Sequence, residues 1–335
     1  MAHITFVHGM ANKPPADRLG FLWLRALGRD DPRPDVFPSP NEGPDLDVKG
    51  ISSEMVYWAD VLYLAPDADE SGYESTGTER SYEGVSRDKA TAMGEDTPQL
   101  DAAGLPAAEA RSMRSIESQL GLDREMGADE FPSDAERRKA EQGQYRLERI
   151  PLPWWLKERL MKILLRDVHH YLFNKESNPR GDRAYRVRDE LRSRLLEALK
   201  RGAAKPPPHI LVSHSMGTII SYDVLRNCGD CPPIHGFVTL GSPLGLDEVQ
   251  DKLKPDGAVS VDFPAAKLRG DWVNVYDRLD PVVAFEPKFA NDYQRDGHSA
   301  VRDINEQNWG DWRHSIHKYL SGTILRSELR RLLGI

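Results

Sequence analysis

The sequence predicts an α/β protein with a mostly parallel sheet covered by helices, because short apolar runs alternate with segments of helical periodicity. Three runs are apolar, rich in β-branched or aromatic residues, and closed by turn residues, as buried strands are. They span residues 4–7, 210–212 and 237–240, and two further strands are expected at 55–64 and 272–276. Helical patterns cover residues 18–27, 184–201, 216–225 and 315–333.

Composition and charge limit the classes of function. The chain has 335 residues, of which 39% are hydrophobic and 29% charged, as in ordinary globular proteins. Its net charge of -8 argues against general affinity for nucleic acid or an anionic membrane, since either requires a basic face. We see no apolar run of about 18 residues, as a transmembrane helix needs, and no secretory signal before the first strand. The default expectation is therefore a cytoplasmic protein.

The two cysteines, Cys228 and Cys231, form a C-x-x-C pair after the helical pattern 216–225. A closed zinc site would need about four ligands, and the sequence offers no second pair. We interpret the cysteines as reduced thiols, with a redox or metal role as the alternative. No metal and no cofactor is expected.

Residues 65–178 differ from the rest and are interpreted as a cap or lid insertion between two parts of one core, residues 1–64 and 179–335. Residues 65–150 are rich in Asp, Glu, Gly, Ser and Ala and supply little core, with one short helix expected at 107–120. Residues 154–173 then predict a strong amphipathic helix. Three interpretations of this helix remain open: packing on the sheet, a lid over an apolar cleft, or contact with a membrane surface.

Residues 213–217, SHSMG, lie where an apolar strand runs into a helical pattern. A turn this sharp holds its central residue at a strained, positive φ, so the residues two before and two after must be small. Ser213 and Gly217 meet that demand, with a serine where the pattern usually has its first glycine. The central residue, Ser215, is the candidate nucleophile for acyl transfer.

A nucleophilic serine needs a base and an acid that orients the base. The stretch VNVYDRLDPVV ends a strand in a turn with two carboxylates, of which Asp280 is the preferred acid and Asp277 the alternative. Near the C-terminus, His314 precedes the last helical pattern, where a loop residue can turn its imidazole over the sheet edge. We expect His314 to be the base, with His317, about one turn inside the helix, and His298 as alternatives.

Acyl transfer also needs N–H donors where negative charge develops, and loss of one donor typically costs about 100- to 1,000-fold in rate. The Met216 amide, directly after Ser215, is the first expected donor. The second is the Met10 amide in FVHGM, where Gly9 allows the backbone to approach closely. We expect His8 to brace this loop by hydrogen bonding.

Taken together, VHGM, SHSMG, TLGSPLG, YDRLDPV and RHS resemble the serine hydrolases of the α/β-hydrolase superfamily, near the lipase and esterase branch. The resemblance covers the sheet core, roughly half of the chain. It implies an α/β-hydrolase fold with a reduced N-terminal part, because the strand before HG is usually the third of eight in that family. It further implies ester hydrolysis without a cofactor, with residues 241–244 lining the cleft and Ser242 only a minor rival nucleophile.

The leading hypothesis is a hydrolase acting on a small-molecule ester or lipid with an apolar acyl group. One alternative is a non-catalytic binding or signalling module that uses the acidic insertion to hold a partner protein. Another is an acyltransferase, thioesterase or phospholipase, which would use the same three side chains. The sequence predicts no oligomeric state.

Overall fold

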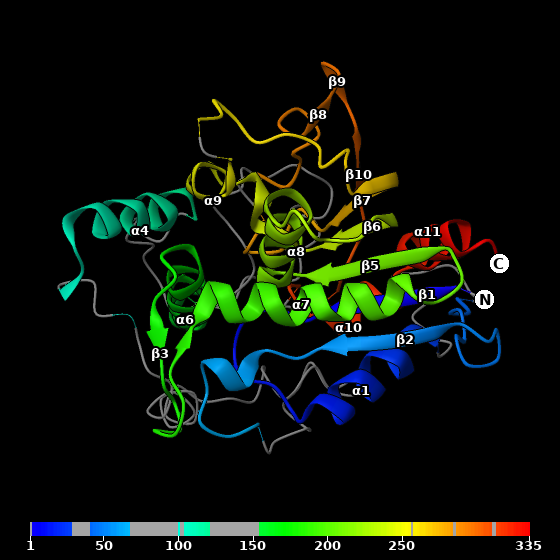
Figure 1. The fold of residues 1–335 in the computed structure, drawn as a ribbon, viewed down its shortest axis with the longest axis horizontal. Helices are drawn as coiled ribbons and strands as arrows, with labels where there is room; N and C mark the ends of the chain where they lie inside the picture. The colour runs from blue at the N-terminus through cyan, green and yellow to red at the C-terminus, as the bar shows by residue number, and fades with distance from the viewer. Residues whose placement is uncertain are drawn as a thin grey trace.

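A six-stranded sheet organises the part of the chain that the computed structural model describes, namely residues 2–28, 41–67, 100, 104–120, 154–255, 257–283, 286–309 and 313–335. All neighbouring strands are parallel, in the order β10-β7-β6-β5-β1-β2 (Figure 1). The strands are β1 (His3–Val7), β2 (Ser52–Val56), β5 (His209–His214), β6 (Ile234–Leu240), β7 (Leu268–Tyr276) and β10 (Val301–Asn305). Two short antiparallel pairs lie outside this sheet: β3 (Glu176–Ser177) with β4 (Tyr185–Arg186), and β8 (Gln294–Arg295) with β9 (His298–Ser299).

Helices cover both faces of the sheet, which makes the described structure an α/β fold. On one face lie α1 (Ala16–Gly28), α10 (Ile316–Ser321) and α11 (Thr323–Leu333). On the other lie α7 (Val187–Ala203) and α8 (Met216–Asn227). Figure 1 shows α4 (Ala107–Gln119), α6 (Trp154–Leu172) and α9 (Asp247–Leu253) grouped toward the carboxyl ends of the strands. Two single turns of 3-10 helix, η1 (Ala59–Val61) and η3 (Pro243–Gly245), complete the described helices.

Successive side chains of each central strand point to opposite faces of the sheet, and each face is covered by an apolar layer. Ile210 and Val212 pack under α1, α10 and α11, whereas Leu211 between them packs under α7 and α8. All three side chains are fully buried. Strands buried on both faces read as continuous apolar runs, and this is why they were visible in the sequence.

The expected strands at 4–7, 210–212, 237–240 and 272–276 are present, but the strand expected at 55–64 is placed wrongly. β2 covers Ser52–Val56, pairs residue by residue with β1, and ends opposite Val7, where β1 itself ends. Beyond that point the chain has no strand to pair with and turns into η1. Sequence reasoning also missed β10, whose sequence VRDIN is mostly polar, as suits a strand at the sheet edge.

Residues 65–178, interpreted from the sequence as an insertion, are only partly described. α4 and α6 occupy the predicted positions, and the apolar side chains of α6 from Leu164 onward belong to the same cluster as those of α7 and α8. α6 packs mainly on the helices α4, α7, α8 and α9. The predictions for residues 68–99 and 121–150 lie outside the described residues, and the core–insertion division stays a prediction.

The last helical segment is not the single helix expected at 315–333, because it breaks at Gly322 into α10 and α11. The buried carboxylate of Glu306 sits at this break and accepts the N–H groups of Ile324 (2.8 Å) and Leu325 (3.1 Å). A Cβ at position 322 would lie 2.3 Å from that carboxylate, so any other residue there would displace the Glu306 side chain. Glu306 thus caps the N-terminus of α11, whose unsatisfied amides attract an anion.

We predict that Glu306 makes the fold less stable as pH rises. Burial raises its pKa from 4.5 to about 7, so the folded state binds its proton more tightly than the unfolded state does. The resulting stabilisation is complete below pH 4.5 and is lost as pH rises through 7; the shift corresponds to roughly 3 kcal/mol. Glu306→Gln lacks this proton, so its stability should not show the same loss as pH rises. The free energy of unfolding of Glu306→Gln minus that of wild type, measured in urea titrations, should therefore increase by about this amount between pH 4.5 and 8. A difference that does not change with pH would contradict the assignment.

Candidate active site

Ser215 occupies the turn between β5 and α8 with φ 52° and ψ -130°, a conformation that is strained for any residue except glycine. Its amide donates to Leu240 O of β6 (2.9 Å), and its carbonyl accepts Thr218 N of α8 (2.9 Å), so both sides of the turn are fixed. Within the described residues, Ser215 Oγ is buried and makes no hydrogen bond. Ser215 is the residue directly before α8.

Two glycines let neighbouring chain segments approach this turn. A Cβ at Gly9 would lie 2.7 Å from the Cβ of Ser215, and a Cβ at Gly217 would lie 2.6 Å from His8 O. Real Cβ atoms do not come this close, so the loop after β1 and the start of α8 meet only because both positions are glycine. Gly217 therefore meets the expected need for a small residue two positions after Ser215, because a side chain there would collide with the loop after β1.

Asp280 and His314 form a buried pair. His314 Nδ1 lies 2.9 Å from Asp280 Oδ1 and 2.8 Å from Oδ2, and the two side chains are 2% and 0% exposed. Val282 N also donates to Asp280 Oδ1 (2.8 Å), and Tyr319 OH donates to Oδ2 (2.8 Å). With its Nδ1 side bonded to a carboxylate, the imidazole has a defined orientation and carries its proton on Nδ1 when it is neutral.

His214, the residue before Ser215, joins this pair to the turn. Its Nε2 donates to the backbone oxygen of His314 (3.0 Å), and the two imidazole rings lie 4.6 Å apart. Burial, followed by the nearby His314, holds the pKa of His214 well below its ordinary value, so the ring is neutral. The structure therefore brings Ser215, Asp280 and His314, which are far apart in the sequence, to one edge of the sheet. Sequence reasoning assigned no role to His214.

Asp277 plays a different part from Asp280. Its carboxylate accepts Leu279 N (2.7 Å) and Asn308 N (2.7 Å) and pairs with Arg313, the residue before His314, at 3.3 Å. Burial raises its pKa, against the opposing effect of Arg313. Asp277 thus shapes the turn and holds the chain leading to His314, while Asp280 contacts the imidazole itself.

Tyr319 and Gly241 are two contributors that sequence reasoning did not single out for this pair. Tyr319 OH accepts Asp277 N (3.0 Å) and donates to Asp280, so one hydroxyl connects both carboxylate-bearing residues. Gly241 has φ 52°, and a Cβ there would lie 2.8 Å from Asp280 Oδ2 and 3.1 Å from His314 Nδ1. In the sequence, this close approach of position 241 to Asp280 and His314 is indicated by nothing more than a glycine directly after a buried strand.

The loop between β1 and α1, residues 8–15, is fixed from its first residue. Trp58 N donates to His8 Nε2 (3.0 Å), so the ring proton is on Nδ1, which donates to Gly9 O (2.8 Å). Trp58 Nε1 also donates to His8 O (3.0 Å), and the two rings stack at 4.5 Å. Burial and the Lys13 ammonium hold the pKa of His8 well below its ordinary value. His8 is a neutral brace, as the sequence indicated.

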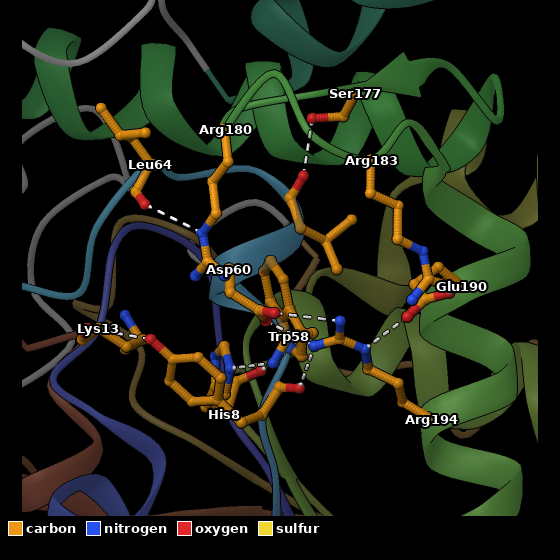
Figure 2. Close-up of polar contacts among 12 residues, drawn as sticks. His8, Lys13, Trp58, Asp60, Leu64, Ser177, Arg180, Arg183, Glu190 and Arg194 are labelled. Atoms are coloured by element: carbon orange, nitrogen blue, oxygen red, sulfur yellow. Dashed lines mark hydrogen bonds and ion pairs between the residues drawn. The ribbon is translucent and has the colours of Figure 1, made fainter.

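Figure 2 shows how the segment carrying Trp58 is itself held. Arg194 of α7 donates to the Asp60 carboxylate and to Tyr57 O, and is also paired with Glu190 at 2.9 Å. Tyr57 OH donates to Lys13 O (3.2 Å). The chain after β2 is therefore tied both to α7 and to the β1–α1 loop.

These contacts define the direction of the Met10 amide. Gly9 C=O and Met10 N–H belong to the same trans peptide and therefore point in opposite directions. Because His8 Nδ1 binds Gly9 O, the Met10 N–H points away from the His8 ring. On the other side of Met10, the buried Lys13 Nζ donates to Met10 O. Met216 is the first residue of α8, so its N–H has no carbonyl one turn earlier to bind.

The alternative residues have other surroundings. His317 lies in the first turn of α10, not one turn inside a helix, and its ring packs edge-on against Trp309 at 6.2 Å. His298 is exposed on β9. Ser242 Oγ accepts Leu244 N (3.2 Å) and bonds Thr218 Oγ1 (2.8 Å), so it caps η3.

Both cysteines are free thiols, Cys228 partly and Cys231 fully buried. Burial raises the pKa of each, to about 12 for Cys231, which makes these thiols poor nucleophiles at neutral pH. Among the described side chains, no group of three or more His, Cys, Asp or Glu residues has the geometry to hold a metal ion. No helix within the described ranges is both long and apolar enough to cross a bilayer.

Comparison with known proteins adds little to this geometry. No protein-family model matches the sequence, and no curated protein is significantly similar to it. Among solved structures, an uncharacterized protein from Pseudomonas aeruginosa is similar at 14% identity with a TM-score of 0.22, over 82% of this chain and 35% of that one. The chain thus spans about a third of that protein's length, and a likeness this distant supports no statement about function.

Proposed function

We propose that the chain is a serine hydrolase with an α/β-hydrolase fold that cleaves carboxylic esters through an acyl-enzyme. The observation that carries the proposal is that two separate features meet at one edge of the sheet. One is the strained turn at Ser215, and the other is the Asp280–His314 pair, whose imidazole packs on the residue next to Ser215. A strained serine and an oriented histidine are costly features that acyl transfer requires.

Each residue then has a defined role. Ser215 attacks the ester carbonyl while His314 accepts its proton, and Asp280 keeps Nδ1 protonated and stabilises the imidazolium that forms. The N–H groups of Met10 and Met216 stabilise the oxyanion. His314 next protonates the leaving alcohol, and water, activated by the same imidazole, releases the acid and restores Ser215.

An apolar acyl group is the substrate feature that the surroundings favour. Met10, Met216 and Leu244 follow three different strands and belong to one apolar cluster with Leu164 and Val168 of α6. These side chains are buried, so an acyl chain that extended from Ser215 into this cluster would meet apolar groups. Thioesterase, phospholipase and acyltransferase reactions use the same chemistry and stay within the proposal, which involves no cofactor or metal.

Ser215→Ala should remove covalent labelling by a fluorophosphonate probe and reduce ester hydrolysis by at least about 1,000-fold, because the attacking oxygen is lost. Labelling is measured by intact mass and peptide mapping, and hydrolysis with p-nitrophenyl esters of increasing chain length. Ser242→Ala, which removes the rival hydroxyl, is the matched control and should still be labelled at Ser215. A Ser215→Ala protein that still reacts fully with the probe would disprove the assignment.

Replacing the two neighbouring histidines separately should distinguish the base. His314→Gln loses the imidazole that contacts Asp280 and should lower kcat by at least about 1,000-fold. His317→Gln replaces a ring that packs on Trp309 and should stay within about tenfold of wild type, since the proposed proton transfer uses His314. Steady-state kinetics on one ester tests both, with circular dichroism as the control for folding. If His317→Gln proves to be the inactive variant, the proposed base is wrong.

A further inference from the structure

α6 contributes one fully buried charge to the surroundings of the β1–α1 loop. Asp167 lies on α6, five residues before its end, and its side chain is 0% exposed. Its Oδ2 accepts the backbone N–H of Ala11 at 2.9 Å. Ala11 directly follows Met10 and has φ 69°, the left-handed conformation that residues other than glycine rarely adopt. The strained residue is thus held by an acceptor 156 positions away in the sequence.

The Met10–Ala11 peptide is consequently bound at both of its polar groups. Its carbonyl accepts from Lys13 Nζ, and its N–H donates to Asp167. The preceding peptide is bound through Gly9 O by His8. With the peptides on both sides of Met10 fixed, the Met10 N–H can rotate little, and electrostatic stabilisation depends on such preorganised donors.

The surroundings of Asp167 suit an acceptor that must stay in place. Tyr63 OH donates to both carboxylate oxygens (3.0 and 2.9 Å), and the Arg166 guanidinium lies 3.4 Å from Oδ1. Arg166 itself donates to Leu62 O (3.0 Å) and stacks over the Tyr63 ring. A buried carboxylate costs several kcal/mol unless such partners surround it, and here they fix its direction toward Ala11.

We propose that Asp167 is a positioning residue, which acts from α6 through the Ala11 N–H to hold the Met10 amide in the orientation that stabilises the oxyanion. This proposal rests on the proposed hydrolase function for its effect on rate, but the contact to Ala11 can be tested independently. It gives α6 a task beyond covering an apolar surface, because a displacement of this helix removes the acceptor that holds the loop.

The test compares two substitutions at the same position. Asp167→Leu is of similar size and lacks an acceptor, whereas Asp167→Asn retains a carbonyl oxygen for Ala11. We expect Asp167→Leu to lower kcat about 10- to 100-fold with KM changed less than about threefold, and Asp167→Asn to recover most of that loss. Active-site titration with a fluorophosphonate corrects kcat for the fraction of folded enzyme, so a purely structural defect leaves the corrected kcat unchanged.

Asp223→Leu is the matched control. Asp223 is also buried and accepts the hydroxyl of Tyr171 on α6 (2.6 Å). Its other hydrogen-bond partners among the described residues, Arg192 and Asn227, lie outside the β1–α1 loop. Its corrected kcat should stay within about threefold of wild type, since no oxyanion donor depends on it. If the leucine variants do not fold, Tyr63→Phe and Tyr171→Phe form a milder pair with the same expected order, because of these two hydroxyls only that of Tyr63 binds Asp167.

Hydrogen exchange followed by mass spectrometry separates this proposal from the proposed function. Peptides covering residues 8–12 should exchange faster in Asp167→Leu than in wild type, whether or not the protein cleaves esters. In Asp223→Leu, the same peptides should exchange at the wild-type rate. Unchanged exchange together with an unchanged corrected kcat would overturn the role of Asp167. Absence of ester hydrolysis in wild type, with faster exchange in Asp167→Leu, would overturn the hydrolase function and leave the contact to Ala11 intact.

Discussion

The structure depends most on the close approach of three chain segments around Ser215. The serine can hold its positive φ because its amide and carbonyl are bonded to β6 and α8, and the loop after β1 reaches it because Gly9 and Gly217 lack side chains. Any added carbon there would separate the segments. Strain of this kind persists only where the surrounding structure enforces it, and here the central strands of the sheet do so.

Buried carboxylates hold the loops around this turn in place. Asp277 binds Arg313, Asp280 binds His314, Glu306 caps α11, and Asp167 holds Ala11. Each accepts at least one backbone or ring N–H, which offsets part of the cost of burying charge, although burial still raises the pKa of Asp277, Glu306 and Asp167. Apolar side chains of similar size would be cheaper to bury, but they would fix no loop in a particular direction. The distribution of these carboxylates around one sheet edge is therefore better explained by positioning than by stability.

The sequence predicted the central sheet well because strands buried on both faces are continuous apolar runs. It also indicated Ser215, Asp280 and His314 as neighbours, since the carboxyl ends of parallel strands share one edge. It failed where a distant partner decides the local structure. The strand expected to continue beyond Val56 stops because β1 ends, and the last helix breaks because Glu306 occupies the space beside Gly322.

The contact of Ala11 with Asp167 of α6 could not be seen in a one-dimensional pattern either. In the proposed function, the three side chains and two amides act on one substrate carbonyl. A crystal structure of the protein after reaction with a fluorophosphonate tests it most directly. We predict phosphorus bonded to Ser215 Oγ, its oxygen within about 3 Å of the Met10 and Met216 nitrogens, and His314 Nε2 within hydrogen-bond reach of Ser215 Oγ. An adduct on another residue, or a phosphoryl oxygen directed away from both amides, would contradict the account.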